Sequence, residues 1–262
     1  MATAAVPPTP PATAALREGA YREVGVVHHA SVRAERYRLR GAGKIYGDVD
    51  VGELEVEGTL SIGGRLIADQ VDLRGTIDIA GDARIATTAA MEGTIRIDGS
   101  AAATDLRSKG FLRVGGALTV EDTLATTGSF EVSGEARAGF FQPDGLVGIG
   151  GNLTARTIDG RFDGQSRIGG IVAATVRLTP RQLLRLPVDL PFLRPHAALT
   201  VERLEADRVE IEGVTVRYLR SPAIRLGRHC HVTTLEGNLL RRDPSSHVGY
   251  ESRSPPPPGL MR

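Results

Sequence analysis

Residues 75–116 have the sequence GTIDIAGDARIATTAAMEGTIRIDGSAAATDLRSKGFLRVGG, which contains one short motif three times. In each copy a glycine is followed at +2 and +4 by apolar residues and at +6 by a second glycine, as in GTIRIDG at 93–99. Apolar residues that alternate with other residues indicate short β-strands, whereas a helix would show a spacing of three or four. A motif that returns at a fixed period predicts a repeat architecture.

The same motif extends outward from this stretch in both directions. Its first glycine occurs eight times at nearly even spacing, and the last interval is slightly longer than the others: Gly41, Gly58, Gly75, Gly93, Gly110, Gly128, Gly145 and Gly164. The residue at +4 is β-branched in all eight copies: Ile45, Ile62, Ile79, Ile97, Val114, Val132, Ile149 and Ile168. We expect these β-branched residues to form a ladder in the core and the glycines to occupy turns.

Two further pairs of apolar positions follow in most units, so each unit holds three short strands with glycine at two corners. This pattern predicts an all-β, triangular β-helix of 17–18-residue coils. Stacked coils are about 4.8 Å apart, and the inward residues of a coil are covered only by the coils above and below it. Both ends of such a rod therefore need a cap or a partner.

The register of the motif divides the chain into parts. We predict, by residue number, a mostly disordered N-terminal tail at 1–36, a β-helix at 37–240 and a disordered Pro-rich C-terminal tail at 241–262. Within the β-helix we expect regular coils at 41–179, a Pro/Leu-rich insertion at 180–196 and irregular coils at 197–240.

The insertion TPRQLLRLPVDLPFLRPH fits no coil and has two interpretations. It either folds over the rod as a cap or presents an apolar and basic patch to a membrane surface or a protein partner. The apolar residues concerned are Leu183, Leu184, Leu186, Phe192 and Leu193. Large apolar patches are rarely left open, and frequent prolines prevent a continuous amphipathic helix, so we favour the cap.

Composition and charge exclude several classes of protein. The chain has 262 residues, a net charge of +1, 4% aromatics and one cysteine, and it has no long apolar run of membrane-span type. Its acidic middle is flanked by basic segments, which leaves peripheral binding to a membrane or a protein open but gives no nucleic-acid-binding charge. With no signal-peptide pattern at the N-terminus, we expect a cytoplasmic location.

No motif in the sequence predicts catalysis, a cofactor or a metal site. All six histidines lie outside the repeat block, which disfavours an acyltransferase of the hexapeptide-repeat type. The stretch GAGKIYG lacks the spacing of a phosphate loop, and alternation separates Cys230 from its histidine neighbours at 229 and 231. We therefore expect a protein that is not an enzyme. The alternative is a β-helical enzyme or carbohydrate-binding protein, acyltransferase-like or hydrolase-like.

Between the Pro-containing tails lie successive units such as GTIRIDG (93–99), GFLRVGG (110–116) and GSFEVSG (128–134). In this pattern the chain resembles the bactofilins, a family of polymer-forming cytoskeletal proteins. The resemblance covers about residues 37 to 240. It implies a right-handed β-helix that polymerises end to end without nucleotide and serves as a cytoplasmic scaffold in cell shape, division or protein positioning.

Physical reasoning also predicts self-association. An open β-helix ends in unpaired backbone N–H and C=O groups, which are a template for another coil. An end-to-end contact that does not close on itself yields a filament. We expect a homopolymer that forms through the β-helix ends.

Overall fold

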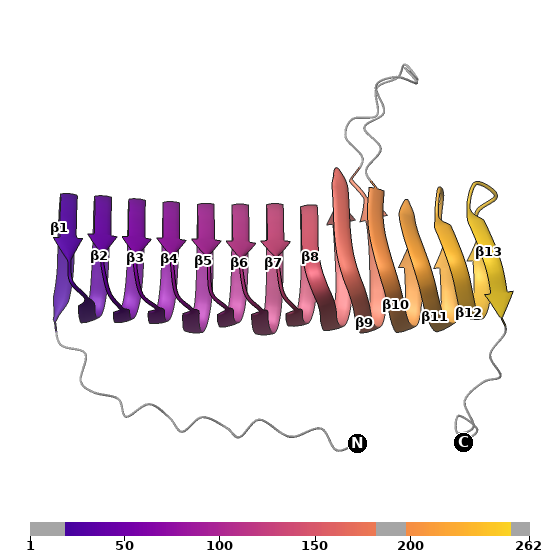
Figure 1. Cartoon of the computed structure of the whole chain (residues 1–262), viewed down its shortest axis with the longest axis horizontal. Coiled ribbons are helices and arrows are strands. Elements are labelled where there is room, and N and C mark those ends of the chain that lie inside the picture. The colour runs from indigo at the N-terminus through magenta and orange to yellow at the C-terminus, as the bar shows by residue number, and fades with distance from the viewer. Residues whose placement is uncertain (1–18, 182–197, 253–262) are drawn as a thin grey trace, which may run out of the picture.

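The computed structural model describes residues 19–181 and 198–252, and both ranges belong to a single parallel sheet coiled into a β-solenoid. Its coils follow one another in sequence order along a rod, with β1 at one end and β13 at the other (Figure 1). Each strand pairs in parallel with the next. The strands are β1 (Ala20–His29), β2 (Val32–Ile45), β3 (Val49–Ile62), β4 (Leu66–Ile79), β5 (Ala83–Ile97), β6 (Ala101–Val114), β7 (Leu118–Val132), β8 (Ala136–Phe162), β9 (Gln165–Pro180), β10 (Ala198–Ile211), β11 (Val214–Leu226), β12 (His231–Arg242) and β13 (His247–Ser252). The predicted all-β repeat fold is therefore confirmed.

The core consists of columns, because each residue stacks on its counterpart in the next coil. The eight β-branched residues at +4 form one such column and are each at most 2% exposed. Register pairing extends that column beyond the repeat block, to His29 before Ile45 and to Val201, Val216, Val232 and Val248 after Ile168. A β-branched residue suits this position because its stiff side chain packs against the same side chain one coil away.

Seven of the eight predicted turn glycines form a second column at a corner of the coil. Gly41 to Gly145 have φ between 111° and 145°, and each pairs with the glycine before it, starting from Gly25. A Cβ added to Gly58 would lie 2.0 Å from the carbonyl oxygen of Gly41, so both the conformation and the close approach require glycine.

Gly164 differs from the other turn glycines. It has a φ of 54°, and its added Cβ would meet only a side-chain atom of Leu146, at 3.0 Å. The interval before it is longer than those between the other glycines, and the backbone N–H of Asp163, not of Gly164, donates to the Gly145 carbonyl. The extra length of chain therefore moves Gly164 out of the column.

The predicted boundaries of both tails were wrong. Strand β1 and the first part of β2 lie in the range expected to be a tail, as do the last two residues of β12 and all of β13. The reason is that these end coils carry polar residues at inward positions, such as Glu23 and His29, so their sequences lack the apolar alternation of the other coils.

The insertion does not interrupt the stack. Strands β9 and β10, on either side of it, are paired from Gln165 with Ala198 to Leu178 with Ile211. The later coils are shorter than those of the repeat block, because Leu199 pairs with Val214 and Thr215 pairs with His231. The proposed cap or patch residues Leu183, Leu184, Leu186, Phe192 and Leu193 lie outside the described residues. Within the described ranges, no helix has the length and apolar character needed to cross a membrane.

Candidate functional site

The two end faces of the rod are the parts of the described structure whose bonding is incomplete. Among residues 19–181 and 198–252, strand β1 pairs only with β2 and β13 pairs only with β12, whereas every strand between them has two neighbours. Neither end strand contains a buried residue. Each therefore presents a free parallel edge, where backbone N–H and C=O groups can pair with another strand.

Four side chains of β1 occupy inward positions at the N-terminal face. Register places Tyr21, Glu23, Val27 and His29 over the buried Tyr37, Leu39, Gly43 and Ile45, respectively. Val27 packs partly against the core, while Tyr21 remains 48% exposed. This face thus combines apolar surface with a carboxylate and an imidazole at positions that are mostly apolar deeper in the rod.

Glu23 holds a polar cluster on this face. Its carboxylate accepts a hydrogen bond of 2.6 Å from the Tyr37 hydroxyl and lies 2.8 Å from Nε2 of His29. Tyr37 is otherwise fully buried, and its burial, followed by the bond to Glu23, raises the pKa of its phenol above the ordinary value. The cluster fixes Glu23 in an inward orientation, so a charged group is part of the end face.

The C-terminal face has a different chemistry. Its inward positions lie over buried residues of the preceding coil and are occupied by Leu239, Arg242, Ser246 and Val248. The Arg242 Nε donates to the carbonyl oxygen of Ser246 at 3.0 Å. Next to these residues, Leu240 is 54% and Tyr250 is 65% exposed. Glu251 pairs with the buried Leu235, so this end offers a carboxylate as well as a guanidinium group beside apolar side chains.

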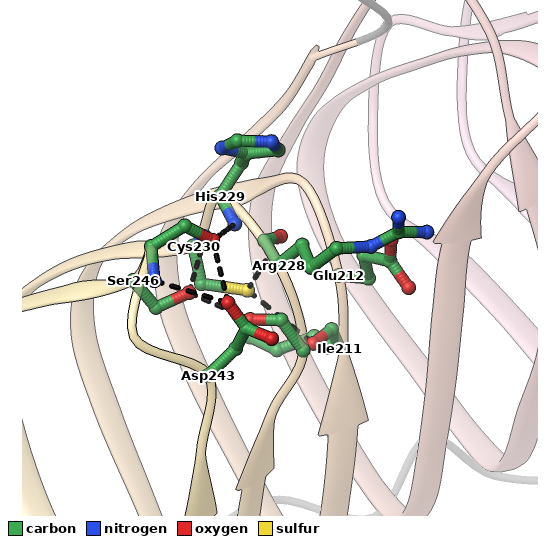
Figure 2. Close-up of polar contacts among 9 residues, drawn as sticks. Ile211, Glu212, Arg228, His229, Cys230, Asp243 and Ser246 are labelled. Atoms are coloured by element: carbon green, nitrogen blue, oxygen red, sulfur yellow. Dashed lines mark hydrogen bonds and ion pairs between the residues drawn. The ribbon is translucent and has the colours of Figure 1, made fainter.

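Hydrogen bonds around Cys230 fix the last turn of the chain before β13 (Figure 2). The Cys230 thiol is buried and donates to the carbonyl oxygen of Ile211 at 3.3 Å, and its backbone N–H donates to Ser246 Oγ at 2.8 Å. The Ser246 hydroxyl in turn donates to the Gly227 carbonyl at 2.6 Å. Burial raises the pKa of the Cys230 thiol, which favours its unreactive protonated form. These hydrogen bonds therefore stabilise the fold of the end coil.

The two histidines beside Cys230 lie on the surface and not next to the buried thiol. His229 and His231 are exposed, and the ring of His231 stacks on that of His247 with centroids 5.2 Å apart. Among residues 19–181 and 198–252, no group of three or more His, Cys, Asp or Glu side chains could hold a metal ion.

The sides of the rod carry ion pairs between coils. Arginines 36, 38 and 40 of β2 pair with glutamates 53, 55 and 57 at the equivalent positions of β3. On the side of β4 to β7 a shallow open groove is lined by residues that include Glu92 and Lys109. Lys109 donates to Glu92 at 2.7 Å, and this bond lowers the pKa of the Glu92 carboxyl. A carboxyl that is ionised in this way is unsuited to act as a general acid.

Sequence reasoning identified the inner coils but missed the residues of the end faces. One signal was present, because Gly25 lies about one repeat before Gly41 and is followed at +2 and +4 by Val27 and His29. The absence of a glycine at +6, where Ser31 stands, concealed it.

No protein-family model, curated protein or solved structure matches this chain.

Proposed function

We propose that the protein is a bactofilin-like structural protein that assembles without nucleotide, through the ends of its β-solenoid, into filaments or scaffolds. The observation that supports this proposal most directly is that, within the part of the chain that the structure describes, β1 and β13 are each paired along one edge only. Between them each strand stacks in parallel on the next, so an added copy would extend the same stack.

The cellular role that accompanies this proposal is a cytoplasmic scaffold for cell shape, division or protein positioning. The protein would then be no enzyme and would need no cofactor, because its activity would consist of presenting a long repetitive surface. The paired charges on the sides of the rod fit this role, since they keep the sides polar and leave the ends as the sites of association.

The experiment that tests this function is analytical ultracentrifugation combined with negative-stain microscopy of the purified full chain in nucleotide-free buffer. We expect filaments or large oligomers whose size increases with protein concentration in the micromolar range. A protein that remains monomeric over that range would refute the proposal. Hydrolysis of an acyl or glycosidic substrate, or binding of a polysaccharide by the monomer, would favour the alternative of a β-helical enzyme or carbohydrate-binding protein.

A further inference from the structure

Two histidines from different coils meet on the side of the rod. His231 of β12 and His247 of β13 are paired in register, and their imidazole rings stack with centroids 5.2 Å apart and planes inclined by 19°. Both side chains are exposed, and along their strands they are followed by the inward residues Val232 and Val248. The imidazole pair therefore faces solvent from the side of the last two coils and is not part of the end face.

The pair differs from other neighbours in the same outward column. Further along that column, Asp78 lies next to Arg96, and the two side chains form an ion pair. His231 and His247 are instead two bases with no acid between them. In the part of the chain that the structure describes, neither ring forms a hydrogen bond or an ion pair with another side chain. Their ring nitrogens are therefore available to a ligand that two bases can share.

The residues around the pair leave room for such a ligand. Thr233 and Gly249 follow the two histidines on the same outward side, so one neighbour is short and the other has no side chain. The nearby cation is Arg217, which the register places over Thr233. Its guanidinium lies 3.8 Å from the Glu202 carboxylate, and this pairing offsets the charge that would repel a positive ligand.

We propose that His231 and His247 bind one divalent transition-metal ion of the class that prefers imidazole, namely Zn²⁺, Ni²⁺ or Cu²⁺. Zinc–nitrogen bonds are about 2.0–2.1 Å long, so two nitrogens on a tetrahedral ion are about 3.4 Å apart. Stacked parallel residues are about 4.8 Å apart, and the χ2 angle of histidine is soft, so both rings can turn toward a shared ion. No third His, Cys, Asp or Glu joins the pair within the described ranges, so water would complete the coordination.

An ion held in this way would join the last coil to the rest of the rod. The backbone N–H of Cys230 already donates to Ser246 Oγ at 2.8 Å, one residue before each histidine. Folding places the two imidazoles side by side, whereas the unfolded chain does not, so the ion binds the folded state more tightly and stabilises it. Because the pair lies on the side of the rod, this site does not depend on the proposed assembly.

Calorimetric titration of the full chain with Zn²⁺ tests the site. His231→Gln and His247→Gln should each weaken the tightest binding event at least about tenfold, because a single imidazole no longer chelates the ion. The double variant should lose little more than either single variant, since the two ligands act as one unit. His229→Gln is the matched control, because His229 is also exposed but is not part of the pair, and it should bind Zn²⁺ as the unmodified chain does. Circular dichroism shows whether each variant is folded.

Two further measurements identify the ligands and the effect on the last coil. Electron paramagnetic resonance of the chain with Cu²⁺ should show two coordinated imidazoles in the unmodified chain and one in each single variant. Zn²⁺ should slow amide hydrogen exchange in β13 of the unmodified chain but not of His247→Gln. Equal Zn²⁺ affinity in all folded variants, or loss of binding in His229→Gln, would overturn the site. Filaments without Zn²⁺ binding would refute the site alone, and Zn²⁺ binding by a strict monomer would refute only the proposed assembly.

Discussion

Replacing one ladder residue by a carboxylate should disrupt the rod, whereas the next residue along the chain should tolerate change. Ile97 is 2% exposed and stacks between Ile79 and Val114. Ile97→Asp loses packing worth about 3 kcal/mol, as other truncations of buried aliphatic side chains do. A buried carboxyl without a hydrogen-bond partner costs about 1–3 kcal/mol more, which gives a loss of about 5 kcal/mol. That loss is comparable to the whole stability of an ordinary domain, about 5–15 kcal/mol.

The assay is unfolding of the full chain by heat and by urea, followed by circular dichroism. Asp98→Ala is the matched control, because Asp98 is the adjacent residue, is exposed and should cost less than about 0.5 kcal/mol. Ile97→Val should cost about 1 kcal/mol, since it removes one methyl group. The Ile97→Asp variant should also lose stability as the pH rises above about 4, because burial raises the pKa of the new carboxyl in the folded state. Equal effects of Ile97→Asp and Asp98→Ala would refute the assignment of inward and outward positions.

Three further outcomes follow from the structure. Gly58→Ala should destabilise the rod by more than about 2 kcal/mol, because its Cβ would lie 2.0 Å from a carbonyl oxygen and its φ is 132°. Gly164→Ala should cost only about 1 kcal/mol. Equal losses of stability in urea unfolding would contradict the glycine column. A thiol reagent at pH 8 should label Cys230 of the native chain at least about tenfold more slowly than in denaturant, because burial raises the pKa of its thiol and shields the sulfur from the reagent. Equal labelling rates would show that the end coil is open. Arg38→Ala should lower the free energy of unfolding by less than about 1 kcal/mol, because its ion pair with Glu55 lies on the solvent-facing side of the rod. The effect should be smaller at high salt. A large loss of stability that persists in about 1 M salt would contradict this account.

The inner coils could be predicted from the sequence because every important contact in them joins residues one repeat apart. Gly93 and Ile97 each meet the equivalent residue of the coils on either side, so one short motif encodes both the local turn and its packing partner. The period of the motif therefore determines the coil, the inward ladder and the outward charges together. The same reasoning failed at Gly164, since an extra length of turn shifts the register without changing the apparent motif.

The end faces could not be predicted in the same way, because a residue there has a stacked neighbour on one side only. Glu23 and His29 occupy core columns but are polar, and alternation of apolar residues gives no sign of them. Only the stacked structure brings Glu23 to the Tyr37 hydroxyl and reveals that the column of Glu23 ends in Arg242. The sequence by itself thus determined the repeat and its core, because those contacts recur at a fixed spacing. The tertiary structure decided which side chains occupy the two ends of the described stack, because the register of its strands adds up from coil to coil and no short segment contains it.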